Sequence, residues 1–79
     1  MTLEQFRQNI ELKKEMEFSS RGINFSISYG RDDDGKNYIA FGEKHLPYEK
    51  YYSWGEFINA AKIGNAWLRY SVEDLVFSN

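Results

Sequence analysis

Apolar residues occupy every second position of residues 23–29, and Asn or Ser separates them. The apolar members are Ile23, Phe25, Ile27 and Tyr29. Because successive side chains of a strand point to opposite faces of a sheet, this period of two predicts a strand that is buried on one face only. An antiparallel sheet with one packed face and one solvated face has this pattern. The rest of the chain therefore has to supply partner strands and a cover for the apolar face.

Two neighbouring segments predict the partner strands. Polar and apolar residues alternate over residues 15–19, and residues 36–41 form a third strand candidate. Residues 20–22 and 30–35 are rich in turn-forming residues, and the second turn contains Asp34-Gly35, a strong hairpin signal. We therefore predict a three-stranded antiparallel meander. Its solvated face would carry Glu15, Glu17, Asn24, Ser26 and Ser28.

An N-terminal helix is predicted over residues 3–12. Thr2 is followed three residues later by Gln5, which is the spacing of a capping box. Apolar side chains then recur at helical spacing at Leu3, Phe6 and Ile10. The helix would therefore be amphipathic and could cover one face of the sheet.

The C-terminal third predicts further helices. Ser53 and Glu56 repeat the capping-box spacing, and they open an apolar stripe. The stripe consists of Trp54, Phe57, Ile58 and Ala61. Gly64-Asn65 interrupts this helix, and Asn65 is expected to cap a third, short helix that carries Trp67 and Leu68. Residues 72–77 fit either an extension of that helix or an edge strand.

These elements predict a single α+β domain over residues 1–79: a three-stranded antiparallel meander with an N-terminal helix and C-terminal helices packed on one face. The chain has no cysteine, so the apolar core has to stabilise it. The predicted core consists of Leu3, Phe6, Ile10, Phe18, Phe25, Ile27, Phe57, Ile58, Trp67 and Leu68. Replacing Phe25 or Trp67 by Ala is expected to cost about 3–5 kcal/mol.

Four segments of the chain carry a resemblance: residues 2–6 at a helix start, residues 15–18 in a strand, residues 53–57 at the later helix start, and Ile63-Gly64-Asn65 followed by Trp67-Leu68. In these segments the chain resembles a set of small uncharacterised bacterial and prophage proteins. The resemblance implies the same α+β fold. It carries over no catalytic residues.

Composition and charge exclude several classes of function. The net charge of −2 is not that of a typical DNA-binding domain. The first residues contain no leader-like pattern, and no apolar run approaches the length of a membrane span. We therefore expect a cytoplasmic protein without membrane contact.

No catalytic, metal-binding or cofactor-binding constellation is predicted. His45 is the only histidine, and no serine or threonine lies between it and Tyr52. The three carboxylates of residues 32–34 are consecutive, whereas a calcium loop of the EF type spaces its carboxylates at alternate positions. We interpret this acidic run as a solvated turn that could face a basic partner.

Two segments remain as candidates for a contact with a partner. They are the acidic turn with Asp32, Asp33 and Asp34, and the tyrosine-rich segment with Tyr48, Tyr51 and Tyr52. Tyrosine is enriched in protein interfaces, although one or two of these rings could simply cover the edge of the core. The two readings stay open at the level of sequence.

The leading hypothesis is a small non-enzymatic protein-binding module, for example an inhibitor or accessory factor of a phage or mobile element that acts on a host protein. The alternative is a single-stranded nucleic-acid-binding protein, because aromatic and basic residues interleave. The residues concerned are Lys44, Lys50, Arg69 and Tyr70. A homodimer through an open sheet edge is a further hypothesis.

Overall fold

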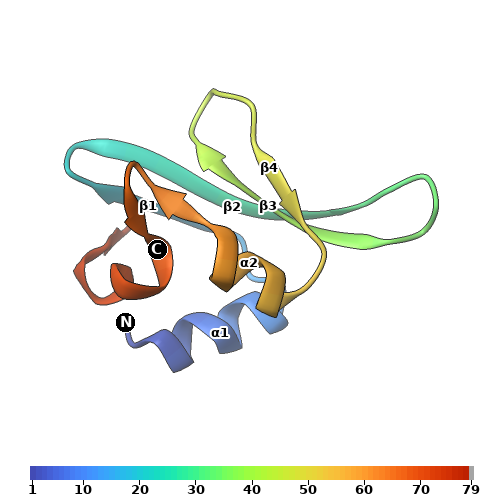
Figure 1. Ribbon diagram of the computed structural model, residues 1–79, viewed down its shortest axis with the longest axis horizontal. Coiled ribbons are helices and arrows are strands. Elements are labelled where there is room, and N and C mark those ends of the chain that lie inside the picture. The colour runs from blue at the N-terminus through green and yellow to red at the C-terminus, as the bar shows by residue number, and fades with distance from the viewer. Residues whose placement is uncertain (79) are drawn as a thin grey trace.

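The computed structural model describes residues 1–78, in which two α-helices lie on one face of a five-stranded antiparallel sheet (Figure 1). The helices are α1 (Leu3–Glu11) and α2 (Trp54–Ala60). The sheet has the order β4-β3-β2-β1-β7 and consists of β1 (Met16–Ser20), β2 (Ile23–Arg31), β3 (Asn37–Glu43), β4 (Glu49–Tyr51) and β7 (Val76–Phe77). A separate ribbon pairs β5 (Lys62–Ile63) with β6 (Ala66–Trp67). Two short 3-10 helices, Leu68–Tyr70 and Val72–Asp74, follow the ribbon.

The predicted meander is present at the centre of the sheet. Strand β2 pairs with β1 on one side, where Phe18 lies opposite Phe25, and with β3 on the other, where Ile27 lies opposite Phe41. Because opposite residues of an antiparallel pair share a face, these registers place the apolar residues of all three strands on one side. The alternation in residues 23–29 therefore predicted the buried face of the sheet.

The sheet is larger than predicted because each edge gains a strand. On one edge, β4 forms inside residues 42–52, for which no strand was predicted, and Lys50 lies opposite Ala40. On the other edge the tail, left open between helix and strand, forms β7, in which Phe77 lies opposite Phe18. Both strands are too short to show a period in the sequence. The three-stranded meander is therefore corrected to a five-stranded sheet.

The predicted third helix is shorter than expected and begins later, as the 3-10 helix Leu68–Tyr70, and Asn65 does not cap it. Gly64 and Asn65 form the two-residue turn of the β5–β6 ribbon, in which Lys62 pairs with Trp67. Gly64 has a φ of 60°, which glycine adopts without a steric cost. A Gly-Asn pair of this kind is typical of a tight hairpin, so Gly64-Asn65 connects two strands and does not begin a helix.

Both predicted helix starts are confirmed. The amide of Gln5 donates to the Thr2 hydroxyl at 3.1 Å, and the amide of Thr2 donates to the Gln5 side chain at 2.9 Å. In α2 the amide of Glu56 donates to the Ser53 hydroxyl at 3.0 Å. These caps satisfy backbone donors that have no partner within the helix. Each helix therefore begins where its capping residue predicted.

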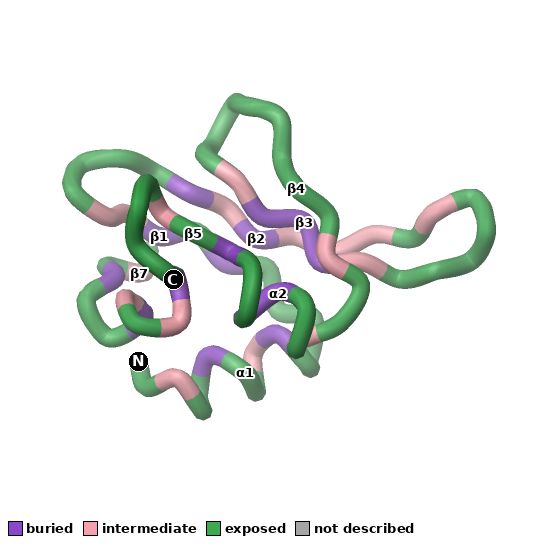
Figure 2. The backbone as a smooth tube through the Cα atoms, in the orientation of Figure 1, coloured by how far each residue is buried: buried purple, intermediate pink, exposed green. Residues whose placement is uncertain are grey.

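The core fills the space between the sheet and the helices (Figure 2). Eight of the ten predicted residues are buried there, namely Phe6, Ile10, Phe18, Phe25, Ile27, Phe57, Ile58 and Leu68. Leu3 is partly buried and packs against them. Trp67 was wrongly assigned to the core, because it is 41% exposed and carries the ammonium of Lys62 over its ring. Val72 and Leu75, from the segment after the ribbon, are buried in its place.

The opposite face of the sheet is not covered by a helix (Figures 1 and 2). Glu17 and Asn24 are exposed there, and Ser26 and Ser28 are half-buried beside β3. No helix among residues 1–78 is long and apolar enough to cross a lipid bilayer. The uncovered sheet face therefore leaves its side chains available for contact with a partner.

Candidate functional site

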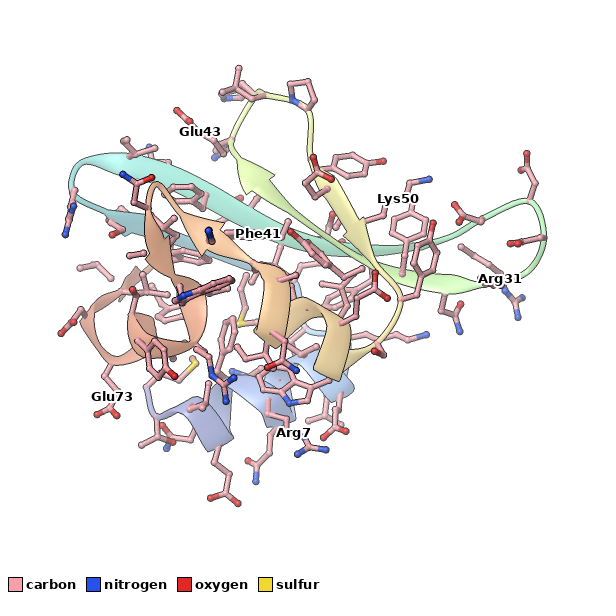
Figure 3. All side chains as sticks on the ribbon, in the orientation of Figure 1. Arg7, Arg31, Phe41, Glu43, Lys50 and Glu73 are labelled. Atoms are coloured by element: carbon pink, nitrogen blue, oxygen red, sulfur yellow. The ribbon has the colours of Figure 1, made fainter. Side chains whose placement is uncertain are left out.

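Three tyrosines, a lysine and an aspartate gather on the uncovered face at the corner formed by β3 and β4. They are Asp32, Tyr38, Tyr48, Lys50 and Tyr52, and we call them the tyrosine surface. Figure 3 shows Lys50 at this corner, on the side of the sheet away from the helices.

The strand period explains why these residues share a face. The ring of Tyr51 packs on Phe57 of α2, with centroids 5.3 Å apart, so Tyr51 points towards the core. Its neighbours Lys50 and Tyr52 therefore point the other way. Tyr38 lies on the same face, because it alternates along β3 with the buried Ile39.

Asp32 links the hairpin turn to β4. One carboxylate oxygen of Asp32 lies 2.8 Å from the Lys50 ammonium, and the other accepts the Tyr52 hydroxyl at 2.6 Å. The Lys50 ammonium also lies 4.5 Å from the centroid of the Tyr38 ring. One ammonium is thus held by a carboxylate and by the face of an aromatic ring.

The three rings also support one another. Tyr38 stacks on Tyr48 with centroids 6.5 Å apart and meets Tyr52 edge-on at 6.4 Å. Tyr38 lies opposite Gly30 on β2, and its ring covers the glycine so closely that a Cβ at residue 30 would clash with it. Gly30 therefore allows the ring of Tyr38 to lie flat across the sheet.

The electrostatics follow from these contacts. The Lys50 ammonium and, next, the Tyr52 hydroxyl lower the pKa of Asp32. The same carboxylate raises the pKa of Lys50 and, through its hydrogen bond, that of Tyr52. The nearby Tyr48 hydroxyl and then loss of solvent raise the pKa of Tyr38. At neutral pH the surface therefore presents an ion pair between the neutral phenols of Tyr38 and Tyr52.

The structure brings together only part of the predicted contact residues. Asp32, Tyr48 and Tyr52 belong to the tyrosine surface, and Asp33 and Asp34 line an adjoining depression of about 450 Å³. Arg31, Asp32, Tyr38 and Lys50 complete the lining of that depression. Tyr51 lies apart from these residues, because its ring is packed on the core side of the sheet.

Two members were not identified as site residues by sequence reasoning. Tyr38 had a signal, because the period of residues 36–41 separates it from Ile39 and Phe41 and so places it on the solvated face. Lys50 was named only among the residues of the nucleic-acid hypothesis. Its place beside Asp32 depends on the pairing of β3 with β4, which the sequence did not reveal.

The other residues considered in the sequence, His45 and the basic residues Lys44 and Arg69, lie outside the tyrosine surface. His45 lies in the exposed loop between β3 and β4 and has a φ of 71°. Within residues 1–78, no group of three or more His, Cys, Asp or Glu side chains could hold a metal ion. Lys44 forms an ion pair with Glu17 at 2.8 Å, and Arg69 donates to Asn59 at 2.7 Å. Arg69 lies beside residues of α1 and α2, whereas Lys50 lies on the uncovered face of the sheet, so the basic residues of the nucleic-acid hypothesis do not form one patch.

Comparison with known proteins adds no assignment. No protein family, curated protein or solved structure matches the chain.

Proposed function

We propose that this chain is a small non-enzymatic protein-binding module that contacts its partner through the tyrosine surface. One observation carries the proposal. Asp32 joins the acidic turn to Tyr52 and Lys50, so that two segments 20 residues apart form one exposed surface.

The residue types favour a protein partner. Tyr48 and Tyr52 are 51% and 43% exposed, and both rings contact Tyr38. Tyrosine offers a large, rigid contact area together with a polar hydroxyl, and it is enriched in protein interfaces. Rings that already support one another lose little further freedom on binding, so more of the contact energy remains as affinity.

The proposed biological context is an inhibitor or accessory factor of a phage or mobile element that acts on a host protein. The support is the resemblance of the two helix starts and of β1 to small uncharacterised bacterial and prophage proteins. A module of this kind needs a contact surface and no catalytic group, and the tyrosine surface meets that need.

Single-stranded nucleic-acid binding is the second candidate. The stacked rings of Tyr38 and Tyr48 beside Lys50 favour it, as do the ring–cation pairs Lys62–Trp67 and Arg69–Tyr70. The contact of Lys50 with Asp32 counts against it, because a paired ammonium is a weaker partner for phosphate. A titration with single-stranded oligonucleotides at low and high salt distinguishes the candidates. Salt-sensitive binding would favour nucleic acid.

The protein-binding proposal is tested by affinity capture from a lysate of the native host cells. The wild-type chain is compared with the double variant Tyr48→Ala/Tyr52→Ala. Tyr70→Ala is the matched control, because Tyr70 is 77% exposed and lies outside the tyrosine surface. We expect a captured protein that is lost with the double variant and kept with the control. Equal capture by all three chains, each with an unchanged melting temperature, would contradict the proposal.

A further inference from the structure

We propose that the tyrosine surface is a receptor for a basic side chain of the partner, and that Lys50 occupies this receptor in the free chain. The inference rests on the proposed function and names the chemistry of the partner: a lysine or arginine in an exposed segment.

The arrangement around Lys50 is that of a cation site. An ammonium group is bound by a negatively charged oxygen, and the electron-rich face of an aromatic ring within about 6 Å adds a further attraction. Asp32 supplies the oxygen at 2.8 Å and Tyr38 supplies the ring face at 4.5 Å. The hydroxyl of Tyr52 holds the second carboxylate oxygen at 2.6 Å and so orients the carboxylate. A guanidinium matches the same groups, since it pairs with carboxylates and stacks on rings.

Comparison with a second ion pair, Lys44–Glu17, shows that the aromatic ring beside Lys50 distinguishes this site. Lys44 and Glu17 also lie 2.8 Å apart, and the Lys44 side chain is 41% exposed against 40% for Lys50. The ring–cation contacts within residues 1–78 include Lys50 with Tyr38 and do not include Lys44. The two lysines are therefore matched in distance and exposure, and they differ in the aromatic contact and in the exposure of the carboxylate, which is 23% for Asp32 and 51% for Glu17.

Lys50 can leave the site at a small cost. Its side chain is 40% exposed and that of Asp32 is 23% exposed, and an ion pair that water still reaches is worth little. The depression beside it is lined by the carboxylates of residues 32–34 and by the cations Arg31 and Lys50. When the Lys50 ammonium swings out, the lining keeps three carboxylates and the single cation Arg31, and Lys36 lies nearby. The vacated surface then attracts a basic group from outside.

The experiment uses acetylated tetra-arginine amide as the probe and follows the ring signals of Tyr38 and Tyr52 by NMR at low salt. Lys50→Met removes the ammonium and keeps the apolar stem. We expect it to bind the probe about three- to tenfold more tightly than the wild type, since the competing charge is absent. Lys44→Met changes the net charge equally and should match the wild type. Adding Asp32→Asn to Lys50→Met should abolish the gain.

Several results would overturn the inference. An equal gain in Lys50→Met and Lys44→Met would show only a general effect of charge. Unchanged ring signals in Lys50→Met, or tighter binding of oligothymidylate than of the peptide, would also exclude a basic-side-chain receptor. If capture of the partner still depends on Tyr48 and Tyr52, these results leave the protein-binding proposal in place. If capture does not depend on those tyrosines, the protein-binding proposal fails whatever the peptide does.

Discussion

At the scale of the residue, burial rather than size determines what an aromatic ring contributes to stability. Phe25 is 7% exposed and stacks on Phe18 and Phe41, with centroids 5.5 and 5.9 Å away. Trp67 is larger, but its ring lies on the β5–β6 ribbon and is 41% exposed. The expectation of equal cost at both positions therefore needs correction.

We predict that Phe25→Ala lowers the free energy of unfolding by about 3–5 kcal/mol, because it leaves a cavity among the stacked rings. Trp67→Ala should cost about 1 kcal/mol, since much of that ring is already in water. Urea denaturation measures both values. A Trp67→Ala variant as unstable as Phe25→Ala would contradict the placement of β6.

Gly42 is a position where a single methyl group should disturb the neighbouring loop. A Cβ there would lie 3.0 Å from the Cα of Tyr48 and 3.2 Å from the carbonyl oxygen of Pro47. Both are backbone atoms, so the segment that leads into β4 would have to move.

We predict that Gly42→Ala costs about 1–3 kcal/mol, as overpacking typically does, and shifts the NMR signals of Tyr48. Gly55→Ala is the matched control. A Cβ at residue 55 meets only the Ser53 hydroxyl oxygen at 4.0 Å, and alanine favours a helix. A Gly42→Ala variant as stable as Gly55→Ala would show that the loop is not packed against β3 as described.

At the scale of the element, both edges of the sheet are short. Strand β4 has three residues and β7 has two. Short edges and an edge lysine discourage the addition of a foreign strand, and Lys50 lies in the middle of β4. These features favour the tyrosine surface over the sheet edges as the contact site. A solution mass measurement tests the hypothesis of an edge-paired homodimer.

The cap of α2 should matter for the core and for the tyrosine surface. Ser53 caps this helix, which carries the buried Phe57, while Glu56 accepts the amide of Tyr52 at 3.3 Å. We predict that Ser53→Ala costs about 1 kcal/mol and that Ser53→Asp restores most of the loss. Thermal unfolding measures both variants. Equal melting temperatures for Ser53→Ala and the wild type would contradict a stabilising role for the cap.

At the scale of the whole molecule, alkaline pH should weaken the fold through its tyrosines. Burial, and next the charge of Glu15, raise the pKa of Tyr29 to about 12. The hydroxyl of Tyr29 donates to the carbonyl oxygen of Lys14 at 2.7 Å, which ties β2 to the chain before β1. Ionisation would remove this donor and place a charge against the core.

We predict that the free energy of unfolding falls between pH 10 and about 12. In this range the unfolded chain loses the Tyr29 proton first, because a free tyrosine has a pKa of about 10. Stability is therefore complete below pH 10 and declines as pH approaches the folded value. Urea denaturation from pH 8 to 11.5 measures the decline, and Tyr29→Phe should reduce its slope. Tyr70→Phe, which alters an exposed ring, serves as the control. An unchanged slope in Tyr29→Phe would contradict the prediction.

The local features of the fold were predictable from the sequence. The alternation in residues 23–29 predicted the central strand and its buried face, and Thr2 and Ser53 predicted where the helices begin. These signals are readable because a strand period or a cap depends on residues within one or two turns of chain. The acidic turn and Tyr48 and Tyr52 were also found as candidates, each within its own segment.

The remaining features depend on contacts between distant segments. Strand β4 forms by pairing with β3, where Lys50 lies opposite Ala40, and β7 forms by pairing with β1, where Phe77 lies opposite Phe18. Strands of two or three residues are too short to show an alternating pattern in the sequence. Trp67 was wrongly expected in the core for a similar reason, because its exposure follows from the pairing of β5 with β6. The sequence by itself determined the central strands, the helix starts and most of the core, because those signals are local. Only the tertiary structure joined Asp32 to Lys50 and Tyr52, because that contact requires β3 and β4 to pair before the hairpin turn and the tyrosines can meet.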